Sequence, residues 1–254
     1  MKIFTLQNSE LVAQEKPLVD LNVALHASRE EALVRLDNFD VEFYAKSRNS
    51  LDGGVSKLSQ YVEHGLLSIE DFLEHIEKTQ SHKHEESLLK QLYWREFFLS
   101  TYEESPQKIW QDCEPYKTGF CADEYADTLA EDIQNASTGI ALVDTLVKEL
   151  QDNGYLHNHA RLYLAAYIVH FRRIKWQAGA RWMLGLLNDG NIGVNNLSWQ
   201  WVASTNSNKP YIFNWENVEK FAASYRFKRH EHQIFDASYE VLQERLFKEE
   251  KQGV

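Results

Sequence analysis

Residue types typical of disulfide-rich, zinc-binding or membrane proteins are scarce in this sequence. Only two of the 254 residues are cysteines, and Cys113 and Cys121 do not form a Cys-x-x-Cys pair. A disulfide framework and a zinc site are therefore not expected, and we expect no bound metal. No stretch is apolar and long enough to cross a membrane, and the first residues lack the apolar segment of a signal peptide. These absences predict a cytoplasmic protein without a membrane partner.

The signatures of the common nucleotide-binding folds are also missing. The sequence contains neither a GxGxxG motif nor a Walker A motif, so a nucleotide would not bind through a Rossmann turn or a P-loop. The alternation of apolar and polar residues that marks β-strands is nearly absent, which makes a sheet unlikely to be part of the fold. Basic residues are fewer than acidic ones: the sequence has 27 Lys and Arg and 38 Asp and Glu, which gives a net charge of −11. This balance argues against a surface built wholly for phosphate contacts but allows a local basic cleft.

What the sequence does contain is apolar residues at helical spacing. Ser28, with Glu31 three residues later, has the pattern of a capping box, and Ser68 begins a second capped helix. A strongly periodic helix is predicted over 87–103. Further helices are predicted over 139–152, 157–173, 176–188, 192–203, 215–225 and 231–250. The predicted fold class is therefore all-α.

The same patterns predict the organisation of the chain. Residues 1–27 lack helical periodicity and are expected to form an extended N-terminal arm. Residues 28–225 are expected to form one helical domain. Residues 226–254 are expected to form a charged C-terminal helix that packs on this domain or trails from it.

Two segments in the first half of the chain carry side chains suited to binding a ligand. The run GGVSKLSQY, residues 53–61, offers N–H groups, hydroxyls and a cation at a predicted helix start, as phosphate sites do. Gln91, Trp94 and Arg95 place an amide, an indole and a guanidinium on one helical face. Each segment also has an ordinary explanation, a capped helix for the first and an amphipathic helix with an extended Arg for the second.

The second half of the chain contains two more such segments and most of the tryptophans. Asn158 and Arg161 are three residues apart at a helix start, beside His157, which alone would be read as structural. Asn191, Asn195 and Trp199 are spaced by four and share one face, and so many asparagines in one helix indicate binding rather than stability. Five of the seven tryptophans follow residue 175, which suggests stacking or electron transfer as well as core packing.

The order of these motifs resembles the FAD-binding domain of photolyases and cryptochromes. The run of motifs is GGVSKLSQY, WREF, TGIALVD, LHNHAR, KW, LNDGNIGVNNLSWQW and KPYIFN, and it covers roughly residues 28–221. Their combined order and spacing are far more specific than any single motif. The resemblance implies a helical domain that holds FAD in a bent form.

The resemblance also implies roles for individual residues. Those implied to bind the cofactor are Tyr44, Ser56, Lys57, Leu58, Ser59, Gln91, Arg95, Arg161, Asp189, Asn191 and Asn195. Arg161 and Asp189 would form an ion pair beside the flavin ring, and Asn195 would face flavin N5 and share the catalytic role with Trp199 and Trp176. The last two would be the first members of the electron chain for photoreduction. The cavity for a flipped-out pyrimidine dimer would be lined by Gln91, Trp94, Asn158, Leu162 and Trp201.

The sequence departs from the family pattern at several of these positions. Val55, Lys57, Gln91, His159 and Asn191 stand where the family has Thr, Arg, Glu, Arg and Asp. The segment 116–127, which normally supplies a third tryptophan, has none, so Tyr116 or Tyr125 is the expected substitute. No N-terminal antenna domain is expected, so no binding site for a second chromophore is evident.

Two main functions remain open at this point. The first is light-driven repair, in which reduced FAD passes an electron to a pyrimidine dimer in damaged DNA, with single strands included as substrates. The second is a cryptochrome-like photoreceptor whose flavin state is read by a protein partner. The retained tryptophans favour repair, whereas Gln91, His159 and the acidic balance favour signalling. A third possibility is a flavoprotein that serves only as an interaction module.

Overall fold

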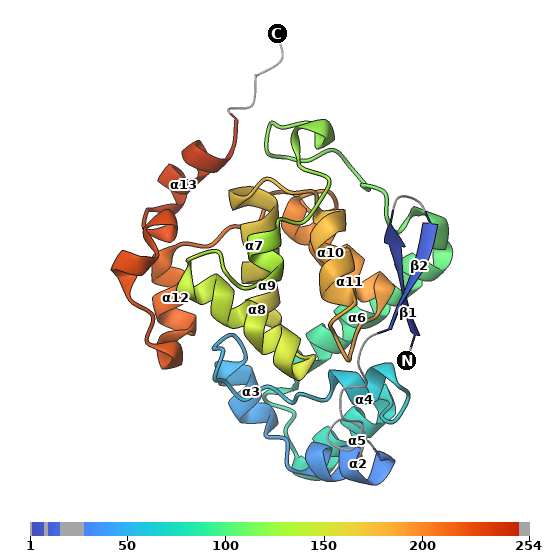
Figure 1. Cartoon of the computed structure of the whole chain (residues 1–254). Helices are drawn as coiled ribbons and strands as arrows, with labels where there is room; N and C mark the ends of the chain where they lie inside the picture. The colour runs from blue at the N-terminus through green and yellow to red at the C-terminus, as the bar shows by residue number, and fades with distance from the viewer. Residues whose placement is uncertain (1, 8–9, 16–27, 249–254) are drawn as a thin grey trace.

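The computed structural model describes residues 2–7, 10–15 and 28–248 (Figure 1). Strands β1 (Lys2–Gln7) and β2 (Glu10–Glu15) pair antiparallel, with Lys2 opposite Glu15 and Gln7 opposite Glu10. The expectation that a sheet is absent is therefore wrong for this stretch, although each strand is only six residues long, while the N-terminal arm stays a prediction. The rest of the predicted arm, residues 16–27, lies outside the described residues.

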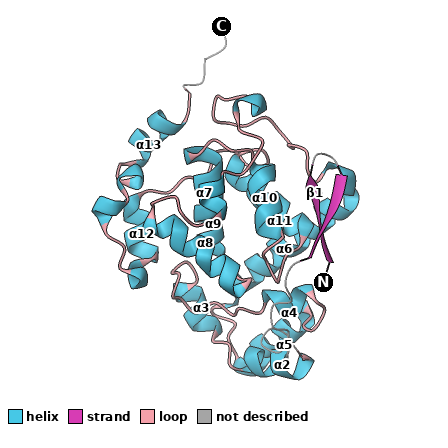
Figure 2. Cartoon of the chain, viewed as in Figure 1, coloured by secondary structure: helices cyan, strands magenta, loops and turns pink. Residues whose placement is uncertain are grey.

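The predicted helical fold is confirmed, as the colouring by secondary structure shows (Figure 2). Its helices are α2 (Arg29–Asp37), α3 (Val41–Ser47), α4 (Ser59–Glu63), α5 (Ile69–Thr79), α6 (Glu85–Glu104), α7 (Glu131–Gln134), α8 (Ala141–Asn153), α9 (Asn158–Ala166), α10 (Trp176–Leu184), α11 (Ile192–Ala203), α12 (Trp215–Phe221) and α13 (Tyr239–Leu246). Helix α9 continues as a π-helical turn, η3 (Tyr167–Phe171), so the helix predicted over 157–173 changes its hydrogen-bond pattern near its end.

Serine caps fix the starts of two of these helices. The Ser28 hydroxyl accepts a hydrogen bond from the Glu31 N–H at 3.1 Å, although the Glu31 carboxylate binds Arg35. At α5 the capping box is complete, because Ser68 and Asp71 each accept from the other's backbone N–H. These bonds satisfy N–H groups that a helix start leaves without partners.

The core that positions the site consists of two hydrophobic clusters. Helices α2 to α6 contribute the smaller one, which includes Leu36, Tyr61 and Phe72. Helices α8 to α12 contribute most of the larger one. Helix α11 belongs to the larger cluster and packs against α9 and α10, and it also packs against α6 of the smaller cluster (Figure 1). Residues on α11 therefore face several elements at once.

The C-terminal segment differs from its prediction. Instead of one charged helix over 231–250, it forms two 3-10 turns, Arg229–Glu231 and Gln233–Phe235, followed by α13. The reason is burial: His232 and Phe235 have 0% exposure and are drawn into the core, and the helix begins only after Ser238. The His232 Nε2 accepts a hydrogen bond from the Leu142 N–H at 3.0 Å, at the first turn of α8. Residues 249–254 lie outside the described residues.

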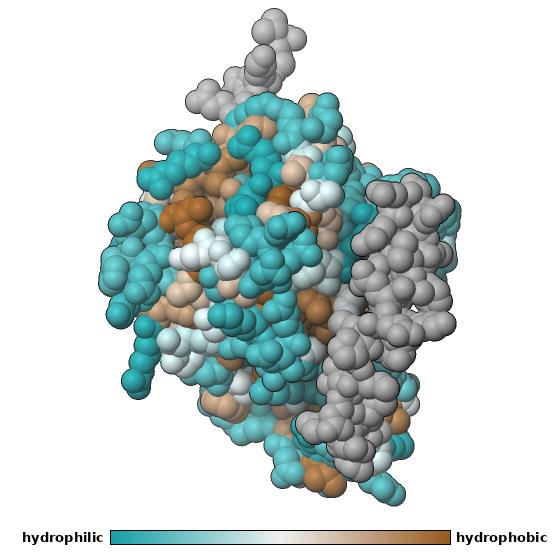
Figure 3. All heavy atoms as spheres, in the orientation of Figure 1, coloured by the Kyte–Doolittle hydropathy of each residue, from teal (hydrophilic) through white to brown (hydrophobic). Residues whose placement is uncertain are grey.

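The surface of the molecule is mixed in character. In the view of Figure 3 hydrophilic residues cover most of the described surface, with apolar residues in separate patches. In the part of the chain that the structure describes, no helix combines the length and apolarity needed to cross a bilayer.

Candidate functional site

Seven of the predicted site residues line one cavity formed by α9, α10, α11 and the loop between the last two. They are Asn158, Arg161, Leu162, Asp189, Asn191, Asn195 and Trp199. Residues from two sequence motifs 30 or so positions apart thus meet, because α9 and α11 pack against each other. The cavity walls are partly polar and partly apolar, which is usual for a cofactor site.

The Arg161–Asp189 ion pair is formed as expected. The Arg161 Nη2 donates to both carboxylate oxygens of Asp189, at 3.0 and 2.8 Å, and its Nε donates to the Leu156 carbonyl oxygen at 2.8 Å. The Asp189 side chain is only 5% exposed, against 24% for Arg161. The pair thus holds the guanidinium in a fixed orientation at the cavity wall.

Asn195 is placed so that its carbonyl oxygen is left for a ligand. Its Nδ2 donates to the Ala180 carbonyl oxygen at 3.1 Å and to the Asn196 Oδ1 at 3.0 Å. These bonds occupy the donor end of the amide, and no described residue donates to the Asn195 Oδ1. Trp199 lies one turn further along α11, with 3% exposure. Asn195 therefore offers an acceptor, which suits a ligand N–H.

The predicted phosphate segment forms a tight loop before α4. The Leu58 N–H donates to the Ser56 Oγ at 3.3 Å, and Lys57 adopts a left-handed backbone with φ of 54°. Lys57 and Ser59 are exposed, whereas Leu58 is fully buried. A Cβ at Gly53 would lie 2.0 Å from the Ser47 carbonyl oxygen, so the turn at the start of this segment requires glycine.

The surroundings of this loop are cationic. Burial, followed by the charge of the neighbouring His159 and those of Arg161 and Lys57, lowers the pKa of His157 to about 4. Burial also lowers the pKa of His159, and the positive charge of Arg48 lowers it further. The lowered pKa values favour neutral imidazoles and Arg161 is paired with Asp189, so the cations left beside this loop are Lys57 and Arg48.

These residues fit FAD in their chemistry. The cationic loop suits a diphosphate, and the Arg161–Asp189 pair with the Asn195 acceptor suits the polar edge of a flavin. Tyr44, also predicted to contact the cofactor, is buried in the smaller hydrophobic cluster, where burial raises its pKa.

Two predicted cofactor residues are already engaged within the protein. The Arg95 Nη2 donates to the Glu63 Oε2 at 2.7 Å. The Asn191 Nδ2 donates to the Glu63 Oε1 at 3.0 Å, while its Oδ1 caps α11 by accepting from the Val194 N–H. Glu63 is thus a site residue that the sequence analysis missed, because nothing local distinguishes it from other carboxylates on short helices. Direct contact of Arg95 with a phosphate stays a prediction.

The residues predicted to accept a pyrimidine dimer divide into two groups. Asn158 and Leu162 line the cavity with the cofactor residues, whereas Gln91, Trp94 and Trp201 are not part of its wall. Trp94 and Trp201 are 49% and 41% exposed, and they lie on α6 and α11, which pack together. Both indoles are therefore available to stack with a base from outside.

Of the two indoles predicted to carry electrons, Trp199 lines the cavity, whereas Trp176 is not part of its wall and has an additional aromatic neighbour. Trp176 is fully buried, and its Nε1 donates to the Asp112 carboxylate at 2.6 Å. Trp110, which the sequence analysis did not select, stacks on Trp176 with a centroid distance of 6.2 Å and an interplanar angle of 4°. The two are 66 positions apart, so only the fold reveals the contact.

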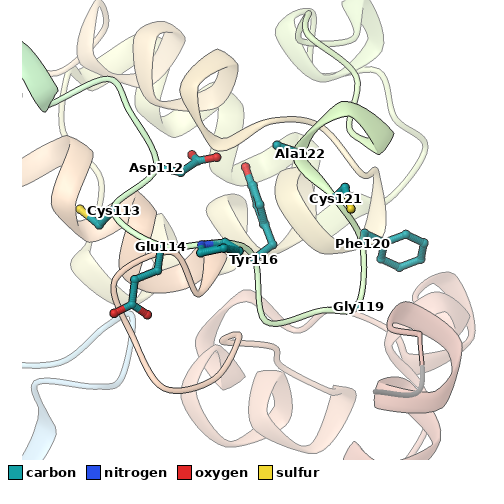
Figure 4. A pocket seen from close by; sticks show the side chains of 9 residues that line it. Asp112, Cys113, Glu114, Tyr116, Gly119, Phe120, Cys121 and Ala122 are labelled. Atoms are coloured by element: carbon teal, nitrogen blue, oxygen red, sulfur yellow. The ribbon is translucent and has the colours of Figure 1, made fainter. Parts of the chain in front are cut away.

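The tyrosines expected to replace a third tryptophan form a separate stack. Tyr116 and Tyr125 lie 4.3 Å apart between ring centroids. Figure 4 shows Tyr116 among the residues of an open cavity that also contains Asp112 and the two cysteines. The buried Tyr116 hydroxyl has no hydrogen-bond partner among the described residues.

The comparisons with known proteins agree with this geometry. Residues 88–231 match the family model described as the FAD binding domain of DNA photolyase. The deoxyribodipyrimidine photo-lyase of Streptomyces griseus is 31% identical over 163 residues, which are 64% of this chain and 35% of that protein. The corresponding protein of Escherichia coli is 33% identical over 136 residues, 50% of this chain and 27% of that protein. The chain thus spans about a third of the length of these curated relatives.

Solved structures show the same fold. A bacterial class III photolyase from Agrobacterium tumefaciens superimposes with a TM-score of 0.71 at 23% identity, over 94% of this chain and 54% of that one. A cryptochrome from Synechocystis superimposes with a TM-score of 0.69 at 19% identity, over 93% of this chain and 56% of that one. At these identities the likeness concerns the fold.

Proposed function

We propose that this chain, which belongs to the family of FAD-binding domains of DNA photolyases, repairs pyrimidine dimers in DNA with light. FAD, when bound in reduced form, supplies the electron that splits the dimer after excitation. The protein provides binding, orientation and exclusion of water. We place this activity in the cytoplasm, with damaged DNA as the partner.

The observation that carries the proposal is that an Asn acceptor, an Arg–Asp pair and a buried indole share one cavity. Asn195 and Arg161 hold the polar edge of the cofactor, and Trp199 covers it on the α11 side. Asn158 and Leu162 belong to the same wall, so a substrate that touches them is next to the cofactor.

The exposed indoles of Trp94 and Trp201 would contact the bases of the DNA. A dimer is poorly stacked, so flipping it out of the strand costs less than flipping an intact base. Trp94 and Trp201 offer stacking surfaces worth roughly 1–3 kcal/mol per base. The Gln91 amide can hydrogen-bond a thymine edge, although without the charge assistance of a carboxylate. Such recognition suits single-stranded or locally open DNA.

The second candidate is a flavin photoreceptor. Trp176 and Trp110 form a stacked indole pair that leads from the core to a half-buried position, which suits electron entry from the surface. A net charge of −11 weakens association with DNA, and a protein partner would then read the state of the flavin. Trp199→Phe should slow light-driven reduction in either case, because phenylalanine is much harder to oxidise.

The deciding experiment measures the loss of cyclobutane dimers per absorbed photon. The protein is loaded with FAD, fully reduced, and illuminated with dimer-containing single- and double-stranded DNA. We expect repair by the wild type, more by Gln91→Glu and less by Trp94→Ala. Tyr93→Ala is the matched control, because Tyr93 is also exposed on α6 and is not assigned to the substrate cavity.

The outcomes separate the two candidates. Repair that Trp94→Ala lowers and Tyr93→Ala leaves unchanged supports the enzyme. No light-dependent repair by any of the proteins, on either form of DNA, would favour the photoreceptor. A folded protein that retains no FAD would contradict both.

A further inference from the structure

The last residue of α4, Glu63, and the residue that follows it, His64, both hydrogen-bond the loop before α11. The Glu63 Oε1 accepts from the Asn191 Nδ2 at 3.0 Å, and the His64 Nε2 bonds the Asn188 carbonyl oxygen at 2.9 Å. Asn188 and Asn191 flank Asp189, which forms the cavity ion pair. The phosphate loop and the flavin cavity are therefore joined through the end of α4.

Glu63 also makes an ion pair on its other side. Its Oε2 accepts from the Arg95 Nη2 at 2.7 Å, and the side chains of Glu63 and Arg95 are 18% and 24% exposed. The Arg95 Nη1 contacts Glu96 as well, at 3.1 Å, but the Glu96 side chain is 47% exposed and its charge is largely screened by water. Glu63 is thus the main partner that neutralises Arg95.

The hydrogen bonds leave Asn191 no freedom to turn. Its Oδ1 accepts from the Val194 N–H at 3.0 Å as the cap of α11, and its Nδ2 is held by Glu63. An aspartate at this position would keep the cap but set a second carboxylate against Glu63. The amide of Asn191 and the carboxylate of Glu63 are therefore a matched pair.

We propose that Glu63 is a positioning residue of the flavin site that fixes Asn191 and neutralises Arg95, and thereby sets the balance between oxidised and reduced flavin. The inference rests on the proposed binding of FAD in the cavity that Asn191 lines. Arg161 pairs with Asp189 at the cavity wall, and Arg95 pairs with Glu63 behind Asn191, so with both pairs intact these groups add no net charge to the site. Loss of the Glu63 charge would leave Arg95 uncompensated and favour the more negative, reduced flavin.

The test is the midpoint potential of bound FAD in Glu63→Gln, Arg95→Gln and the double variant. Glutamine at 63 keeps an oxygen for the Asn191 amide, so the geometry is preserved while the charge is lost. We expect a more positive potential in Glu63→Gln, a more negative one in Arg95→Gln, and a value near the wild type in the double variant. For each single variant the ratio of affinities for reduced and oxidised FAD should change on the order of tenfold, as for a unit charge at about 10 Å in a dielectric constant of about 20.

Glu96→Gln is the control, since it removes a more exposed carboxylate from the same guanidinium. Its shift should be clearly smaller than that of Glu63→Gln. Equal shifts in the two, or shifts of the same sign in Glu63→Gln and Arg95→Gln, would overturn the proposal. A wild-type protein that is folded but binds no FAD would instead overturn the proposed function.

A second measurement does not depend on the potential. Asn191→Asp should lower the melting temperature of the FAD-free protein and its retention of FAD, because two carboxylates would then face each other. Adding Glu63→Gln should restore both, since a glutamine amide can donate to the new carboxylate. The proposal fails if Asn191→Asp behaves like the wild type, or if Glu63→Gln gives no rescue.

Discussion

The Arg161–Asp189 pair allows the sharpest test of the cavity, through Asp189→Asn. The substitution keeps the shape of the side chain but removes its charge, and it can turn an N–H₂ group toward the Arg161 Nη2, which now donates to both oxygens. The guanidinium would keep its bond to the Leu156 carbonyl oxygen. The cavity wall would thus lose an anion without gaining a void.

The size of the effect follows from the burial of the pair. Removing one partner of a fully buried ion pair costs about 3–5 kcal/mol, because the other charge is left uncompensated. Arg161 is 24% exposed, so water recovers a part of this cost, and we expect about 2–3 kcal/mol. For a chain of this length the melting temperature should fall by about 5–10 °C.

The assay compares thermal unfolding and FAD retention in Asp189→Asn and a control, Asp127→Asn. Asp127 pairs with Lys175 but is 79% exposed, so its loss should cost about 1 kcal/mol at most. The difference between the two variants isolates the burial of the Asp189 charge. If both variants unfold at the same temperature and retain FAD equally, the assignment of Asp189 to the cofactor site is wrong.

Three further predictions concern electron entry, DNA and pH. Trp110→Phe should slow light-driven FAD reduction, measured as flavin bleaching, because Trp110 stacks on the next indole; unchanged kinetics would exclude this route. In binding to dimer-containing single strands, measured by fluorescence anisotropy, Trp201→Ala should lose about 1–3 kcal/mol at low and high salt, whereas Lys57→Ala should lose affinity mainly at low salt. Burial lowers the pKa values of His157 and His170 to about 4, so the unfolded chain binds more protons between pH 6.5 and 4. The contribution of these histidines to the free energy of unfolding is therefore complete above pH 6.5 and is lost as the pH falls toward 4. At pH 5 the loss should be about 2 kcal/mol per histidine, which urea unfolding at pH 7.5 and pH 5 can check.

Helices with strong apolar periodicity could be predicted closely from the sequence. The helix expected over 192–203 is observed as Ile192–Ala203, and that expected over 139–152 as Ala141–Asn153. In α8 the buried side is encoded by apolar residues three and four positions apart, such as Leu142, Leu146 and Leu150, whereas α11 has buried residues on all its sides. The segment after residue 226 could not be predicted from local periodicity, because the burial of His232 depends on α8, which is remote in the sequence.

The site could be predicted only as far as its motifs are local. The Arg161–Asp189 pair and the Asn195 position came from the resemblance, and the structure brings these residues into one cavity. Glu63 and Trp110 could not be predicted, because Glu63 binds Asn191 and Trp110 stacks on Trp176, both on elements remote in the sequence, and no spacing rule connects them. Contacts of this kind are determined by packing rather than by a pattern along the chain.

The bond between His232 and the first turn of α8 has a consequence for the order of synthesis. The Leu142 N–H finds its partner only in a residue 90 positions later, and that imidazole is itself held by the Lys228 carbonyl oxygen at 2.7 Å. As the chain leaves the ribosome, α8 to α11 are available to pack long before this cap exists. The start of α8 therefore gains this cap only after residue 232 has been synthesised, and a product that ends before His232 would contain the residues of the cavity without the cap of α8.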